Sequence, residues 1–175
     1  MITDISPYII YEMSSLKGSH VQLCRYDFNG RPDNEGFAIV SDIYSFFVRV
    51  RPNIVDEKYD VNFLEIKAFQ NIELDDSFTF HPVFEGALKD IKIMKSSVRG
   101  MVVRSKVIQE VITENALLAD FEGDKRFLIY PSKQNIYTCT ALSTKTDEIL
   151  DIMSEQRFRV SREVQRDINL LLPEQ

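Results

Sequence analysis

The chain has 175 residues, of which 44% are hydrophobic, and it carries a formal net charge of −6. A chain of this length buries the core of one domain, and its apolar fraction excludes the composition of a disordered protein. The negative charge disfavours nucleic acid and anionic membranes unless a local basic patch opposes it, and it suits a basic protein partner. We therefore expect one domain over residues 1–175, which could divide into a β-rich lobe at 1–95 and a mixed α/β lobe at 96–175.

The cysteines and the first residues give no sign of export. Cys24 and Cys139 are isolated and form no CxxC pair, so neither a zinc site nor a redox motif is predicted, and we expect no cofactor. The opening MITDISPYII lacks the basic region and the long apolar region of a signal peptide. No window approaches the ~18 consecutive apolar residues of a membrane span. We expect a cytoplasmic protein with reduced cysteines and no membrane partner.

Strand patterns dominate the first half of the chain. The predicted strands occupy residues 20–28, 37–51 and 61–69, followed by shorter strands within 71–94. Asn29-Gly30 predicts a hairpin or a broad β-turn loop between the first two, in a turn-rich segment that continues to Gly36. The breaks between the shorter strands are expected at Asp75-Asp76, His81-Pro82 and Glu85-Gly86. Residues 6–16 fit either a helix or a strand.

The second half of the chain shows helical patterns as well as a hairpin pattern. Helices are predicted after Ser105, over residues 143–156 and after Ser161, and a hairpin over 126–142. In the first of these helices Val107, Ile108, Val111 and Ile112 would form one buried face. The fold class is therefore α+β, with a mainly antiparallel sheet in the first half and helices with a further hairpin in the second.

The segments around Ser105 and Ser161 resemble each other, since each serine is flanked by cations and followed by a helix-like pattern. N-capping and amphipathic patterning explain most of this similarity. A sharper hypothesis places an anion or nucleotide at the two helix starts, where free N–H groups and a positive dipole end would act with arginine. The residues that this hypothesis assigns to ligand binding are Arg104, Lys106, Arg159 and Arg162.

Residues 63–67, FLEIK, form an apolar strand that contains Glu-x-Lys. This pattern resembles half of the PD-(D/E)xK nuclease motif, in which the Glu ligates Mg²⁺ and the Lys lies near the attacked phosphate. The resemblance implies catalytic roles for Glu65 and Lys67, which alternation places on one strand face. It requires a second carboxylate on the metal, for which Asp56 and Asp60, and Asp33 much earlier in the chain, are candidates. Glu-x-Lys is also what an ordinary solvated strand face carries.

A different set of residues predicts an interaction surface. Phe46 and Phe47 point to opposite faces of one strand, so a sheet with a single covered face would leave one of them exposed, near Arg49 and Arg51. The chain has no P-loop, nucleophile elbow or glycine-rich dinucleotide motif, and its two histidines show no metal-ligand spacing.

The favoured hypothesis is therefore a non-enzymatic protein-binding domain that docks through an acidic or sheet surface. A bacterial or phage inhibitor, an immunity-type protein or a complex subunit would fit. The alternatives are the metal-dependent nuclease and the anion-binding module.

Overall fold

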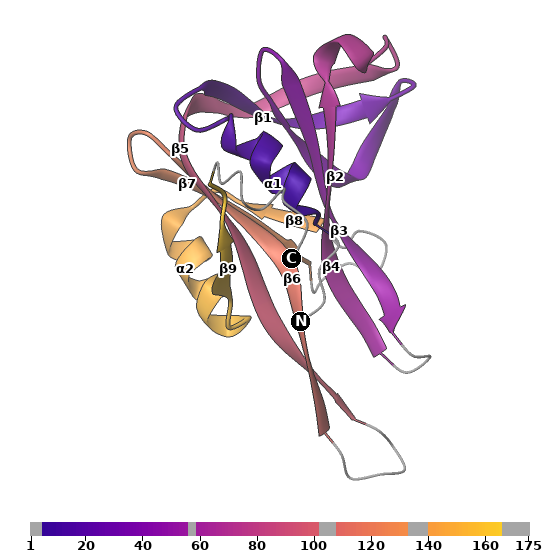
Figure 1. The fold of residues 1–175 in the computed structure, drawn as a ribbon, viewed down its shortest axis with the longest axis vertical. Helices are drawn as coiled ribbons and strands as arrows, with labels where there is room; N and C mark the ends of the chain where they lie inside the picture. The colour runs from indigo at the N-terminus through magenta and orange to yellow at the C-terminus, as the bar shows by residue number, and fades with distance from the viewer. Residues whose placement is uncertain (1–4, 56–58, 102–107, 133–139, 166–175) are drawn as a thin grey trace, which may run out of the picture.

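A computed structural model describes residues 5–55, 59–101, 108–132 and 140–165 (Figure 1). In chain order the elements are α1 (Pro7–Ser14), β1 (His20–Phe28), β2 (Arg31–Val40), β3 (Tyr44–Val55), β4 (Tyr59–Gln70), the 3₁₀ turn η1 (Asn71–Glu73), β5 (Phe78–Met101), β6 (Ile108–Phe121), β7 (Lys125–Pro131), β8 (Thr140–Ser143), α2 (Thr146–Glu155) and β9 (Arg159–Glu163).

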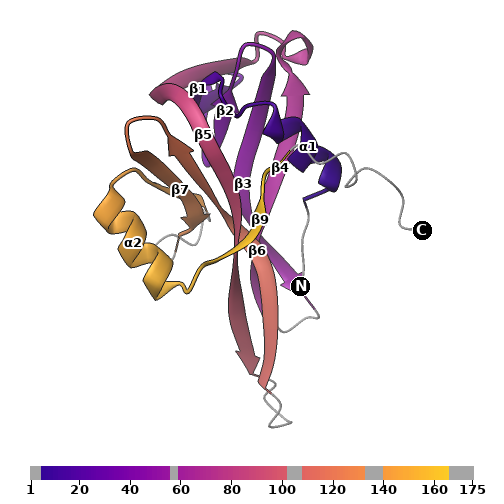
Figure 2. The same ribbon diagram turned by 60° about the vertical axis from the view of Figure 1, so that its left-hand side comes forward.

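The strands form one antiparallel sheet in the order β4-β3-β2-β1-β5-β6-β7-β8, which confirms the predicted mainly antiparallel architecture. β5 joins its two halves. Residues 78–87 of β5 pair with β1, and residues 88–101 pair with β6. β9 pairs with β5 alongside residues 92–95, and the far end of the β5–β6 hairpin extends beyond the rest of the sheet (Figures 1 and 2).

The two halves of the sheet curve around a shared core, so that β4 lies beside β6. Inner-face residues from both halves pack together; α1 adds Ile10 and Met13 to them, and the turn after it adds Leu16. α2 covers the opposite face of the second half, where Ile149 packs against side chains such as Leu118. The expected boundary between lobes, at residues 95–96, lies inside β5.

Local chemistry explains several elements. Asn29 and Gly30 have φ of 52° and 73°, as a type I′ turn requires, so the β1–β2 hairpin prediction is confirmed. The 6–16 segment is helical: the Ser6 hydroxyl accepts a hydrogen bond from the Ile9 N–H, and Pro7 occupies the first turn. α2 and the β7–β8 hairpin are also found where the sequence predicted them.

The helices predicted after Ser105 and Ser161 are both wrong for the residues that the structure describes. Residues 108–121 form β6, and Ser161 lies within β9. Branched residues such as Ile108 and Val111 favour strands, and β5 offers each segment an edge to pair with. Residues 102–107, which include Ser105, and residues 166–175 lie outside the described part.

Of the breaks predicted within residues 71–94, the one at Asp75-Asp76 is confirmed, because it lies between η1 and β5. Those at His81-Pro82 and Glu85-Gly86 are wrong, because β5 runs through both. Pro82 lacks an N–H, and the β1–β5 register shifts between Leu23 and Cys24, beside it, which accommodates the missing donor.

The turn-rich segment up to Gly36 belongs to β2 instead of a broad loop. Gly36 pairs with Arg49 of β3, and a Cβ atom at Gly36 would lie 2.7 Å from the Val48 carbonyl oxygen. Glycine is therefore required by the close approach of two backbones.

We predict that Gly36→Ala lowers the free energy of unfolding by about 1–3 kcal/mol, because the methyl group must push β2 from β3. Gly30→Asn is the matched control, since asparagine tolerates the positive φ and no atom lies within 4 Å of the added Cβ. Urea denaturation measures both changes; equal stability of Gly36→Ala and the unmodified protein would contradict the packing argument.

Candidate functional site

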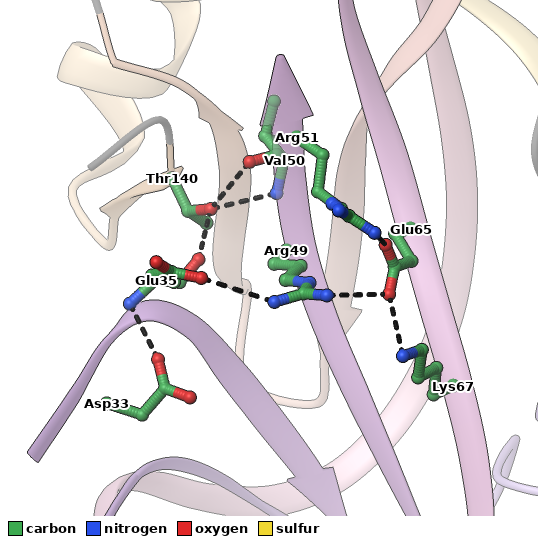
Figure 3. Close-up of polar contacts among 8 residues, drawn as sticks. All are labelled: Asp33, Glu35, Arg49, Val50, Arg51, Glu65, Lys67 and Thr140. Atoms are coloured by element: carbon green, nitrogen blue, oxygen red, sulfur yellow. Dashed lines mark hydrogen bonds and ion pairs between the residues drawn. The ribbon is translucent and has the colours of Figure 1, made fainter. Parts of the chain in front are cut away.

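A cluster of charged side chains lies on the face of β3 and β4 that points away from the main core. Arg49 is directly opposite Glu65, and Lys67 is opposite Phe47. Because side chains alternate along a strand, Arg49, Arg51, Glu65 and Lys67 share this face. Figure 3 shows the three cationic side chains converging on the Glu65 carboxylate.

The Glu65 side chain is only 8% exposed, and both of its oxygens are engaged. Arg49 Nη2 lies 3.1 Å from Oε1, Arg51 Nη1 lies 2.8 Å from Oε2, and Lys67 Nζ lies 3.2 Å from Oε1. Burial by itself raises the pKa of Glu65, but the hydrogen bonds from Arg51, Arg49 and Lys67 outweigh it and lower the pKa to about 2. Glu65 is therefore a fixed anion at neutral pH.

Neighbouring strands hold this cluster in place. Arg49 also binds Glu35 of β2 at 3.2 Å. Just beyond the last residue that pairs β3 with β2, the Thr140 hydroxyl accepts a hydrogen bond from the Val50 N–H at 2.8 Å and donates to the Glu35 carbonyl. The Thr140 side chain, from β8, thus pairs with backbone groups of Val50 and Glu35 at the point where the β2–β3 pairing ends (Figure 3).

The predicted nuclease residues come together only in part. Glu65 and Lys67 are in contact, as the alternation predicted. Asp60 lies in β4, five residues before Glu65, so that about 16 Å of extended strand separates their Cα atoms, too far for one metal ion. Asp56 lies outside the described residues. Among the residues described, no three His, Cys, Asp or Glu side chains are grouped as a metal site.

The expected exposed phenylalanine is absent, because both candidates are buried. Phe46 belongs to the main core, and Phe47 is 9% exposed. Phe47 packs edge-on against Tyr26 and contacts Phe69 and Phe78. The sequence did not reveal that the start of β5 would complete an aromatic cluster on the outer face. Of the four predicted interface residues, Arg49 and Arg51 reach the surface, with side chains 27% and 56% exposed.

The predicted anion-binding residues also separate. Arg162 points to the fully buried Glu114 of β6, with Nε 2.8 Å from Oε1 and Nη2 2.7 Å from Oε2. The Ser161 hydroxyl donates to the same carboxylate at 2.6 Å. Arg159 is exposed, while Arg104 and Lys106 lie outside the described residues. The sequence signal for Glu114 was three consecutive polar residues, 113–115, within an apolar strand.

Sequence patterns did not predict a surface cavity near the β6–β7 turn. A surface cavity of about 240 Å³ is lined by Lys89, Asp120, Phe121, Asp124, Lys125, Arg126 and Thr146. Its charges are mixed, and Arg126 is paired with Asp120 within it.

Comparison with family models, with curated proteins and with solved structures finds no match for this chain. Within the described ranges, neither helix has the length and apolar character needed to cross a membrane.

We predict that Glu65→Gln destabilises the protein in a pH-dependent way. The pKa of Glu65 is lower in the folded protein than its ordinary value of 4.5, so its ion pairs stabilise the fold fully above about pH 5 and are lost as the pH falls towards 2. The stability difference from the unmodified protein should shrink from a few kcal/mol at neutral pH as acid is added. Urea unfolding at several pH values measures it. Glu35→Gln, at a 64% exposed side chain, is the control, and a difference independent of pH would contradict the assignment.

We predict that Arg162→Met lowers the free energy of unfolding by roughly 3–5 kcal/mol, because it leaves the buried carboxylate of Glu114 without its arginine partner. Arg159→Met removes an equal charge from an exposed position of the same strand and should change stability little. Chemical denaturation compares the two. Unchanged stability of Arg162→Met, with loss of a phosphate-induced thermal shift, would instead support the anion-binding hypothesis.

Proposed function

We propose that the protein is a non-enzymatic protein-binding domain that docks through the face of β3 and β4 carrying Arg49, Arg51 and Lys67. The observation that supports this is the contrast in exposure within the cluster. The Glu65 side chain is 8% exposed, whereas those of Arg51 and Lys67 are 56% and 57% exposed. The buried Glu65 carboxylate thus holds the exposed Arg51 and Lys67 side chains in place on the surface of β3 and β4.

Such a surface suits recognition. Long cationic side chains lose conformational entropy on binding, and Glu65 already restricts both of them in the unbound protein. Arginine is enriched at protein interfaces, where its planar head binds carboxylates and lies over apolar side chains. Three cations against Glu65 and Glu35 leave a net charge of +1, so the partner surface that fits is one with exposed carboxylates.

The same ion pairs argue against catalysis by Glu65. A metal ion would have to displace three cations from a carboxylate that already has both oxygens engaged. A general base works best with a pKa near the working pH, and that of Glu65 is about 2. The inhibitor, immunity-type and complex-subunit roles all remain within the proposed class.

The test is a comparison of variants with the same change in charge. Arg51→Ser/Lys67→Ser removes the two exposed cations, and Lys145→Ser/Arg159→Ser removes two exposed cations elsewhere. Tagged protein is used to capture partners from cells that express it, and affinity is then measured by calorimetry with the purified partner. The first variant should bind at least about tenfold more weakly, and the control should bind like the unmodified protein.

Equal affinity of all three proteins would contradict the proposed face. Mg²⁺-dependent cleavage of DNA or RNA that Glu65→Gln abolishes would contradict the proposed class.

A further inference from the structure

One end of the sheet exposes three large apolar side chains. Ile43, in the turn between β2 and β3, is 64% exposed; Ile72, in η1, is 90% exposed; and Tyr8, in α1, is 60% exposed. We call these three residues the isoleucine corner. Single exposed apolar residues are ordinary, but neighbouring ones held by separate elements mark a contact surface.

Hydrogen bonds show that the segments carrying the two isoleucines adjoin. The Asn71 N–H donates to the Ile43 carbonyl at 2.7 Å, and the Asn71 side-chain amide donates to the Ser41 carbonyl at 2.7 Å. The Ser45 hydroxyl donates to the Asn71 side-chain oxygen at 2.6 Å. Asn71 therefore fastens the residue before Ile72 to the turn that carries Ile43.

The remaining side of the corner is tied through Tyr44, the first residue of β3. α1, which carries Tyr8, packs against β4, the strand that leads into η1. The negative charge of Glu12 in α1 is the main cause that raises the pKa of Tyr44. η1 is itself fixed, because the Gln70 N–H donates to the Glu73 carboxylate at 2.9 Å. The apolar side chains are thus presented by an ordered surface.

Three segments around this end carry only negative charge, and the β1–β2 turn with Arg31 adjoins the last of them at residues 77–78. Residues 5–16, 41–46 and 68–80 contain no Lys or Arg. Their acidic residues are Glu12, Asp42, Glu73, Asp75 and Asp76. Four of these, all except Glu12, are exposed. Five acids within these three segments are a strong local concentration in a chain whose net charge is −6.

We propose that the isoleucine corner is a second docking surface, whose partner is a protein with an apolar hollow bordered by Lys and Arg. Apolar contact would supply affinity, and the surrounding carboxylates would select a basic surface and speed encounter. The same carboxylates repel nucleic acid, anionic lipid and a second copy of this acidic end. This surface lies outside the Arg51–Lys67 face and has the opposite charge, so it is independent of the function proposed above.

The experiment begins with a photo-crosslinking amino acid at Ile72 and, as a control, at Val83, which is 47% exposed on β5. A protein crosslinked from Ile72 but not from Val83 is purified, and its affinity is measured for three proteins: unmodified, Ile43→Ser/Ile72→Ser, and Arg51→Ser/Lys67→Ser. Because Ile43 and Ile72 are exposed, their replacement should leave the thermal midpoint unchanged. An Asp42→Asn/Asp75→Asn/Asp76→Asn variant tests the charge.

We expect the isoleucine variant to bind at least about tenfold more weakly and the Arg51/Lys67 variant to bind normally. Association should slow with added salt, and the amide variant should lose that salt dependence. The proposal is overturned by equal crosslinking from Ile72 and Val83, or by affinity that depends on Arg51 and Lys67 alone, a result that leaves the first function standing. It is also overturned if the corner binds phosphatidylcholine vesicles or forms dimers that Ile43→Ser/Ile72→Ser abolishes.

Discussion

The arrangement of this molecule depends on β5, whose backbone is shared by both halves of the sheet. A straight strand of 24 residues would span about 80 Å, and strand twist together with register shifts allows it to curve instead. Shifts occur between Leu88 and Asp90 and between Met94 and Lys95 on the β6 side. The first leaves Lys89 of β5 as an extra residue and the second leaves Asn115 of β6, and such irregularities bend the paired strands locally. The halves can therefore face each other around one core while remaining a single hydrogen-bonded sheet.

This curvature also determines how charge is buried. Glu65 and Glu114 are both acidic residues of strands, and both are nearly or fully inaccessible. Glu65 is paired with arginines of the adjacent strand β3, and Glu114 of β6 is paired with Arg162 of β9, on the other side of β5. An isolated buried carboxylate would be very unfavourable, and these pairs are tolerated because hydrogen bonds from the arginines compensate the lost hydration. Arg162 ties the last described strand to β6, while Arg49 and Arg51 fix the outer face of β3 and β4. A Glu-x-Lys pattern that suggests metal chemistry in the sequence is, in the fold, part of an ion-pair network.

The sequence predicted those features that depend on near neighbours along the chain. Alternation identified β3 and β4, Asn29-Gly30 identified a hairpin, and the acidic first turn of α2 marked its start. The failures have one cause, since each was decided by a partner outside the segment that carries the pattern. A row of branched residues at 107–112 fits a helix face as well as a strand, and only β5 decides between them.

The same limit applies to the candidate site. The convergence of Arg49, Glu65 and Lys67 follows from the pairing of adjacent strands, and alternation along each strand was enough to predict their shared face. The pairing of Arg162 with Glu114 joins residues 48 apart, and the cover over Phe47 comes from the start of β5. No local pattern identifies Arg162 as the partner of Glu114 or predicts the cover over Phe47. Ser161 was therefore interpreted as a helix cap, and one phenylalanine was expected to be exposed.

Net charge was the weakest guide to partners, for a physical reason. At physiological ionic strength exposed charges are screened beyond roughly 8 Å, so a partner senses the local surface more than the whole-molecule value. The β3–β4 face has nearly balanced charge, and its selectivity must come from the geometry of fixed cations around Glu65. The isoleucine corner has only acids around apolar side chains, and there the local field itself can select a partner. Two surfaces of different sign on one small sheet protein are thus compatible with a single net charge of −6, which describes neither of them.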